Sequence, residues 1–139
     1  MSTPDPSTPR PYGGAKRLCR ADELLERGKG MLFEVLEYGR RAPAFALRFE
    51  GKVVAYLNRC VHVPTTLDWQ PGEFLDADQR WLLCSVHGAS YEPHSGRCVG
   101  GPCGRGKLTA IEVAEVDGWV VWYPNRDIQP LPSSSSSLD

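Results

Sequence analysis

The sequence lacks the long apolar runs of a membrane protein: no stretch of its 139 residues approaches the roughly eighteen apolar residues of a spanning helix. It also lacks an excess of charge, since 16 basic residues face 17 acidic ones and leave a net charge of −1. This balance gives no reason to expect nucleic acid or a membrane as a partner. Residues 1–12 hold no apolar segment of a secretory signal, so we expect a cytoplasmic protein.

Cysteine and histidine are also scarce, with five cysteines and three histidines in the chain. Five cysteines fit a reduced cytoplasmic protein better than a secreted disulfide framework. Cys98 and Cys103 lie five residues apart, and we expect both to be reduced thiols. Cys19 is expected to pack in a core.

The other two cysteines each lie close to a histidine. Cys60 precedes His62, and 21 residues further on a second pair begins, Cys84 with His87. Side chains at i and i+2 project to one face of an extended chain, whereas a spacing of three suits a tight turn. The four residues therefore predict a metal site. From the spacing alone zinc remains a competitor, because Cys₂His₂ is a common zinc set, although zinc usually pairs like ligands and here each pair is mixed.

The residues that follow the second pair favour one metal group. They read Gly-Ala-Ser-Tyr-Glu over 88–92 and Ser-Gly-Arg-Cys-Val-Gly-Gly-Pro over 95–102. With a C-x-H pair, a C-x-x-H-G pair, an aromatic residue four positions past the second histidine, an S-G-R turn and a Gly-Pro loop, the chain resembles the Rieske family over about residues 16–123. That family carries a [2Fe–2S] cluster in which two histidines replace two cysteines on one iron.

The resemblance implies one [2Fe–2S] cluster per chain and assigns its ligands. Cys60 and Cys84 would bind the inner iron, while His62 and His87 would bind the outer, more exposed iron. It also implies two neighbours of the cluster. The Tyr91 hydroxyl would bond a cysteine sulfur, and the loop of Gly101 and Pro102 would cover the cluster.

Three positions depart from the high-potential members of the family. Those members form a disulfide between the two ligand loops, but the matching positions here are Thr65 and Val86. They also carry a serine that donates to a cluster sulfide, where this chain has Ala89. Since hydrogen bonds to sulfur stabilise the reduced cluster, we expect a potential toward the low end of the Rieske range of about −150 to +300 mV.

The resemblance further implies an electron carrier rather than a catalyst. A Rieske-type ferredoxin would take electrons from a flavoprotein reductase and pass them to a terminal oxygenase or another acceptor. Only about sixteen residues follow Tyr123, and the sequence shows no acid, base or nucleophile set. The alternatives are a small subunit of a larger oxidoreductase, such as a nitrite reductase, and a structural or sensor metal-binding protein.

The strand signals predict a mainly β fold, a Rieske-like β-sandwich with an inserted cluster-binding subdomain. We expect a disordered arm over 1–14, a folded domain over 15–127 with the insert at about 59–104, and a flexible serine-rich tail over 128–139. The expected elements are strands at 16–20, 31–38, 44–49, 52–58, 80–83, 111–116 and 119–123, and a helical turn at 21–27. Glu50-Gly51 and Asp117-Gly118 are expected hairpin turns.

Charged residues surround the predicted ligand loops. We expect a solvated surface, and we also consider the hypothesis that some of the basic residues recognise an acidic redox partner. The residues are Arg59, Arg97, Arg105 and Lys107, against Asp68, Glu73, Asp76 and Asp78.

Overall fold

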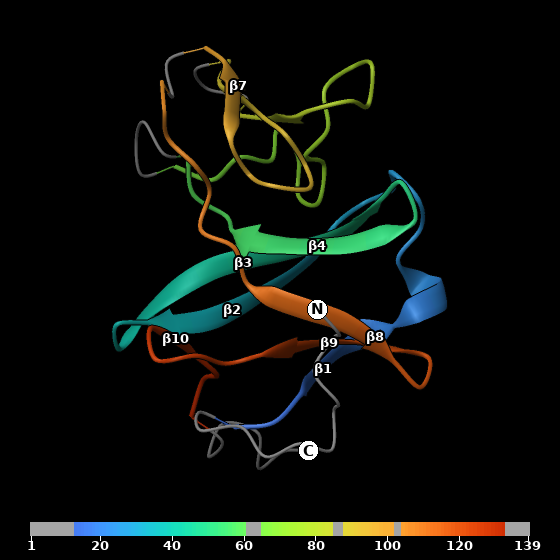
Figure 1. The fold of residues 1–139 in the computed structure, drawn as a ribbon, viewed down its shortest axis with the longest axis vertical. Coiled ribbons are helices and arrows are strands. Elements are labelled where there is room, and N and C mark those ends of the chain that lie inside the picture. Colours follow the sequence, from blue (N-terminus) through green and yellow to red (C-terminus); the bar gives the residue numbers. More distant parts are fainter. Residues whose placement is uncertain (1–12, 61–64, 85–87, 102–103, 133–139) are drawn as a thin grey trace.

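The computed structural model describes residues 13–60, 65–84, 88–101 and 104–132. Within these residues, strands form a base of two antiparallel sheets, and a smaller sheet lies above them (Figure 1). The elements in chain order are β1 (Lys16–Arg20), the 3₁₀ turn η1 (Ala21–Glu23), β2 (Met31–Glu37), β3 (Arg40–Phe49), β4 (Lys52–Leu57), β5 (Leu82–Leu83), β6 (Ser90–Tyr91), β7 (Cys98–Gly100), β8 (Glu112–Val116), β9 (Trp119–Tyr123) and β10 (Ile128–Gln129).

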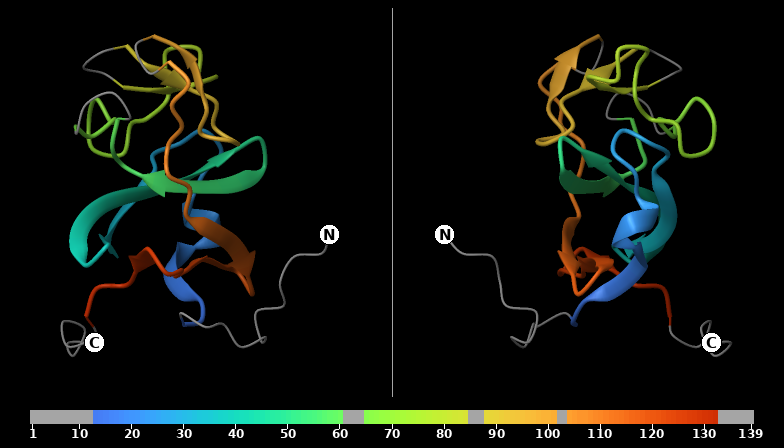
Figure 2. Two further views of the ribbon diagram at one scale, coloured as in Figure 1. Left: turned by 60° about the vertical axis from the view of Figure 1, so that its left-hand side comes forward. Right: turned by 90° about the vertical axis from the view of Figure 1, so that its right-hand side faces the viewer.

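The base sheets have the strand orders β1-β9-β8 and β10-β2-β3-β4. They meet where β4 approaches the start of β8: Leu57 N donates to Thr109 O, and Ile111 N donates to Ala55 O, both at 2.9 Å. The third sheet, β5-β6-β7, belongs to the segment inserted between β4 and β8 (Figure 2). This arrangement confirms the predicted β-sandwich with an inserted subdomain.

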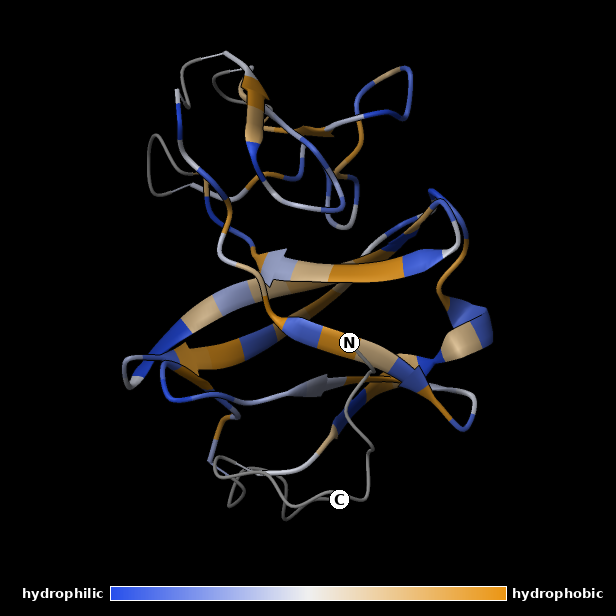
Figure 3. Cartoon of the chain, in the orientation of Figure 1, coloured by the Kyte–Doolittle hydropathy of each residue, from blue (hydrophilic) through white to orange (hydrophobic). Residues whose placement is uncertain are grey.

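Residues 44–47 of β3 are buried on both faces, and large and small apolar side chains alternate along them. Phe45 and Leu47 belong to the core that reaches into the inserted subdomain, where Phe45 stacks on Phe74 with ring centroids 3.9 Å apart. Ala44 and Ala46 belong to the core between the two base sheets. Successive residues of a strand point to opposite faces, so one strand serves two cores. Figure 3 shows the apolar segments along the strands of the base.

Two-residue turns join neighbouring strands of the base. Both central residues have positive φ at Tyr38-Gly39, Glu50-Gly51 and Asp117-Gly118, as a type I′ turn requires. The sequence predicted the second and third turns. The first escaped prediction because tyrosine rarely adopts positive φ, and β3 therefore begins at Arg40 rather than at residue 44.

Two other boundaries differ from the expected ones. The helical turn predicted over 21–27 is a 3₁₀ turn that ends at Glu23. Residue 128, where the flexible tail was predicted to start, is instead part of β10: Ile128 is only 2% exposed and pairs with Glu37 of β2. A buried apolar side chain between two prolines was not visible as a strand, since two residues are too few to show a period.

Candidate metal centre

The first predicted ligand loop leaves the base at the end of β4. Cys60 lies three residues beyond the strand and is 2% exposed. Its backbone N–H donates to Thr65 O at 2.8 Å, which closes the loop from residue 60 to residue 65. His62 lies within 61–64, outside the described residues.

The second predicted ligand loop is closed in the same way. Cys84 follows β5, is fully buried, and donates its N–H to Ala89 O at 2.8 Å. Gly88 N donates back to Cys84 O at 2.8 Å. In both loops the backbone N–H of the cysteine thus donates a hydrogen bond to the carbonyl oxygen of the residue five positions later. His87 lies within 85–87, outside the described residues.

The two cysteine side chains share one apolar core. This core also contains Ala89 and Tyr91, and both cysteines lie outside any disulfide. Tyr91 comes from β6, the central strand of the small sheet, and its hydroxyl lies 3.5 Å from Cys60 Sγ, with either atom able to donate. The fully buried ring therefore holds a polar hydrogen next to one sulfur in a site that excludes water.

Gly101 packs directly on the second loop. A Cβ atom at this position would lie 2.7 Å from Gly88 O and 2.9 Å from the Ala89 Cα, and its φ of +84° is one that side-chain-bearing residues rarely adopt. Only glycine therefore allows the chain that follows β7 to approach the loop so closely. Pro102, the other predicted residue of this covering loop, lies outside the described residues.

The described residues fit a thiolate-bound metal group. Buried thiols in apolar surroundings are weak acids, and a bound metal reverses this by deprotonating its sulfur ligands. Thiolates favour zinc and iron–sulfur clusters. No three His, Cys, Asp or Glu side chains gather into a metal site within the described ranges, and the segments 61–64 and 85–87 lie outside them. Those two segments contain His62 and His87.

The structure corrects one expectation about the other cysteines. Cys98 is disulfide-bonded, although a reduced thiol was predicted. Five residues of spacing around glycines do not reveal whether two cysteines approach within bonding distance, and the prediction rested on compartment alone. Cys103 lies outside the described residues. Cys19 packs in the base as predicted, and burial raises the pKa of its thiol.

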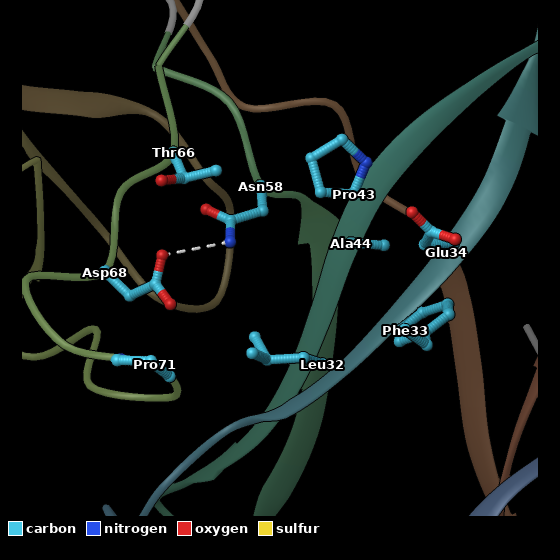
Figure 4. Close-up of a pocket in the computed structure, with 9 residues that line it drawn as sticks. All are labelled: Leu32, Phe33, Glu34, Pro43, Ala44, Asn58, Thr66, Asp68 and Pro71. Carbon is cyan, nitrogen blue, oxygen red and sulfur yellow. Dashed lines mark hydrogen bonds between the residues drawn. The ribbon is translucent and has the colours of Figure 1, made fainter.

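A polar pair that the sequence did not single out brackets the first loop. Asn58 is 4% exposed, and its Nδ2 donates to Asp68 Oδ1 at 3.1 Å (Figure 4). The two residues line an open pocket of about 340 Å³ between the loop and strands β2 and β3, together with Leu32, Phe33, Glu34, Pro43, Ala44, Thr66 and Pro71. The partners are ten residues apart on either side of the loop, so only the fold reveals the contact.

The charges around the loops are divided between internal pairs and open surface. Arg59 is paired within the chain, because it makes two hydrogen bonds to the Glu37 carboxylate at 2.7 and 3.0 Å. Arg97 and Lys107 are exposed and lie opposite one another in an antiparallel bridge. Arg105 is exposed nearby in sequence.

A family model described as the Rieske [2Fe-2S] domain matches residues 15–125. No curated protein matches the chain. Among the residues that the structure describes, no helix is long and apolar enough to cross a membrane.

Solved structures share the fold at low sequence identity. The ferredoxin of carbazole 1,9a-dioxygenase from Nocardioides aromaticivorans IC177 is 19% identical, with 80% of this chain and 98% of that chain covered and a TM-score of 0.62. A complex of reduced oxygenase and oxidised ferredoxin of carbazole 1,9a-dioxygenase matches at 21% identity, with 78% and 91% covered and a TM-score of 0.60. The terminal oxygenase from Novosphingobium sp. KA1 matches at 22% identity with a TM-score of 0.64, with 85% of this chain but only 31% of that chain covered.

Proposed function

Because the chain belongs to the Rieske [2Fe-2S] domain family, which implies one [2Fe–2S] cluster per chain, we propose that it is a one-electron carrier. The observation that carries the proposal is the pair of loops, each closed by the N–H of a buried cysteine, that meet in one core. Such a cluster takes up and releases single electrons when it is bound. The protein's part is to bury the sulfurs, exclude water and fix the loops.

The ligand assignment is part of the proposal. Cys60 and Cys84 bind the inner iron, and His62 and His87 bind the outer iron. The burial of both cysteines and the two closed loops support the assignment of Cys60 and Cys84 to the inner iron. Tyr91 donates to Cys60 Sγ, and Gly101 with Pro102 forms the covering loop.

The proposed partners are a flavoprotein reductase as electron donor and a terminal oxygenase as acceptor, in the cytoplasm. The first two structural neighbours support this, since one is a ferredoxin and the other a ferredoxin bound to an oxygenase. The neighbour that is itself a terminal oxygenase is matched over only 31% of its length, so this chain corresponds to a part of it. A small subunit of a larger oxidoreductase is the second candidate, and a stable large subunit that co-purifies would select it.

Electron paramagnetic resonance of the dithionite-reduced protein tests the cluster. We expect a red-brown protein, two irons per chain and the low average g-value of a Rieske centre. Cys60→Ser should abolish the signal and His87→Cys should alter it. Cys19→Ser is the matched control, because Cys19 is also a buried cysteine but lies in a separate core of the base. A colourless, zinc-containing protein would overturn the proposal in favour of a structural metal site.

The midpoint potential provides a further prediction. Since Ala89 contributes no hydroxyl to the cluster and position 65 is a threonine, we expect a value in the lower half of the Rieske range of about −150 to +300 mV. Protein-film voltammetry measures it directly. A potential in the upper half would show that other contacts compensate for the missing serine and disulfide.

A further inference from the structure

Asn58 is the one polar residue that is buried among residues 13–60, 65–84, 88–101 and 104–132. Buried amides destabilise a protein unless their donors and acceptors are bonded. Here Nδ2 donates to Asp68 Oδ1 at 3.1 Å, and Oδ1 accepts from Leu67 N at 2.8 Å. The backbone N–H of Asn58 donates to Pro43 O at 2.8 Å, so the residue is also anchored to β3.

These bonds lie on both sides of the first ligand loop. Asn58 is two residues before Cys60, and its two side-chain partners follow Thr65. The bond from Asn58 Oδ1 to Leu67 N therefore encloses the bond from Cys60 N to Thr65 O. Asp68 is fixed in turn, because its second oxygen accepts from Gly72 N at 3.1 Å. Figure 4 shows Asn58 and Asp68 pointing toward one another between the loop and β3.

We propose that Asn58 and Asp68 form a clamp that sets the position of the first ligand loop, and thereby the geometry and redox properties of the metal group bound by Cys60. The inference rests on the proposed role of Cys60 as a ligand. Asn58 and Asp68 are positioning residues, since they act on the metal group only through the loop. A buried amide bonded through both Nδ2 and Oδ1 suits this task because its fixed donor and acceptor permit one arrangement of the two chain segments.

In the contact between Asn58 and Asp68, the first residue donates the hydrogen bond and the second accepts it, and a pair of substitutions can exchange these roles. Asn58→Asp keeps the acceptor for Leu67 N but sets two carboxylates against each other across the present 3.1 Å bond. Adding Asp68→Asn restores a donor and an acceptor across that contact, and an amide oxygen can still accept from Gly72 N. The double variant has the net charge of the wild-type protein, so it separates loss of the clamp from a simple change of charge near the cluster.

The experiment compares the cluster-loaded wild type, Asn58→Asp and the double variant Asn58→Asp with Asp68→Asn. The readouts are the paramagnetic resonance line shape, the midpoint potential and the rate of iron loss to a chelator. For Asn58→Asp we expect an altered line shape and iron loss about tenfold faster, as expected when a buried hydrogen bond becomes a like-charge contact. The double variant should return all three readouts to near wild-type values.

Asn125→Asp is the matched control. Its Oδ1 accepts from Asp127 N and Ile128 N, both at 2.8 Å, in the turn before β10, so the same substitution there keeps the acceptor but lies outside the ligand loops. It should leave line shape and potential unchanged even where the melting temperature falls. If Asn58→Asp yields no folded protein, the double variant decides, because recovery of the wild-type spectrum supports the clamp and failure to recover overturns it.

Two results would overturn the inference while leaving the proposed function intact: a wild-type line shape in Asn58→Asp, or a double variant as impaired as the single one. Absence of a Rieske signal from the wild-type protein would instead overturn the proposed function. The two failures are therefore distinguishable.

Discussion

The Tyr91 hydroxyl lies 3.5 Å from Cys60 Sγ inside a core that excludes water. A hydrogen bond to a ligand sulfur stabilises the reduced state more than the oxidised one, because reduction adds negative charge. A bond of about 1 kcal/mol corresponds to about 40 mV for a one-electron couple. Tyr91→Phe should therefore lower the midpoint potential by tens of millivolts, as measured by protein-film voltammetry.

Tyr56→Phe controls for the loss of a buried phenol in the same core. The Tyr56 hydroxyl donates to Pro93 O at 2.6 Å rather than to a sulfur, and burial raises the pKa of its phenol. Its removal should lower the melting temperature without moving the potential. Equal shifts of potential in both variants would show that general repacking, rather than the bond to Cys60, governs the effect.

At this scale the sequence identifies the proposed ligands, but it does not identify the contacts around them. The short spacing between Cys60 and His62 is a local property of the chain, so the sequence displays it. The contact between Asn58 and Asp68 depends on how the intervening loop folds back, and so does the disulfide at Cys98. Neither leaves a periodic or spacing signal that sequence analysis can read.

At the scale of the elements, the segment after β7 can approach the second ligand loop closely only because residue 101 is a glycine. Gly101→Ala would place a methyl group 2.7 Å from Gly88 O, against a backbone that cannot move without displacing the second ligand loop. We expect loss of a large fraction of bound iron and a melting temperature lower by several degrees, as follows from about 1–3 kcal/mol of strain. Iron analysis and thermal unfolding of the purified protein measure both.

Gly104→Ala separates this clash from backbone strain. Gly104 also has positive φ, +58°, but nothing lies within 4 Å of a Cβ atom there. The variant should lose some stability, because alanine disfavours a positive φ, but it should keep its iron. Similar iron loss in both variants would mean that the close approach of Gly101 to Gly88 is not what matters.

The hydrogen bonds of Arg48 hold η1 against the base. Arg48 donates to Ala21 O and Leu24 O, and it makes two hydrogen bonds to Glu115 at 2.8 and 3.1 Å. These bonds to Arg48 hold the pKa of the Glu115 carboxyl below its usual range. A carboxyl with a lowered folded-state pKa stabilises the protein above the unfolded-state pKa, and this stabilisation is lost as the pH falls through the folded-state value.

Glu115→Gln should therefore reduce stability at pH 7 and matter progressively less below about pH 4. Because the Glu115 side chain is 39% exposed, we expect only about 0.5–1 kcal/mol, or a few degrees in melting temperature. Thermal unfolding of both proteins from pH 7 to about pH 3 gives the difference. Glu34→Gln, which removes a more exposed pair with Arg41 at 3.4 Å, should have a smaller effect, and a larger one would contradict the assignment.

Strands long enough to show a period or to end in a recognisable turn were predictable from the sequence. The hairpin of β8 and β9 around Asp117-Gly118 is the clearest example, and both strands end within one residue of the prediction. The strands β6 and β7 were not foreseen, because two or three residues carry no pattern. They pair across the turn over 92–97, where Glu92 N donates to Arg97 O, and such short strands become visible only in the folded structure.

On the scale of the whole molecule, the basic residues beyond β6 form an open positive surface. Arg97 and Lys107 lie opposite each other, and no ion pair found among the described residues involves either of them. Since the net charge of the chain is only −1, such a local surface governs encounters within about 8 Å at physiological salt. Charge complementarity raises association rates when a partner is acidic.

The oxidation of the reduced protein by ferricyanide, an anion, tests this surface without knowledge of the natural partner. We expect the rate constant to fall as salt rises, and Arg97→Glu with Lys107→Glu to lower the rate at low salt by about tenfold or more. Arg41→Glu with Arg40→Glu makes the same charge change on the β2–β3 hairpin of the base and should have little effect. A rate that is independent of ionic strength would exclude a docking role for the basic surface.

Strand β3 takes part in two cores, one under the ligand loops and one between the base sheets. Opening the inserted subdomain would therefore expose Phe45 and Leu47 on a strand whose Ala44 and Ala46 pack in the base. We therefore expect loss of the metal group to increase amide hydrogen exchange in β3, so that this exchange measures cluster occupancy.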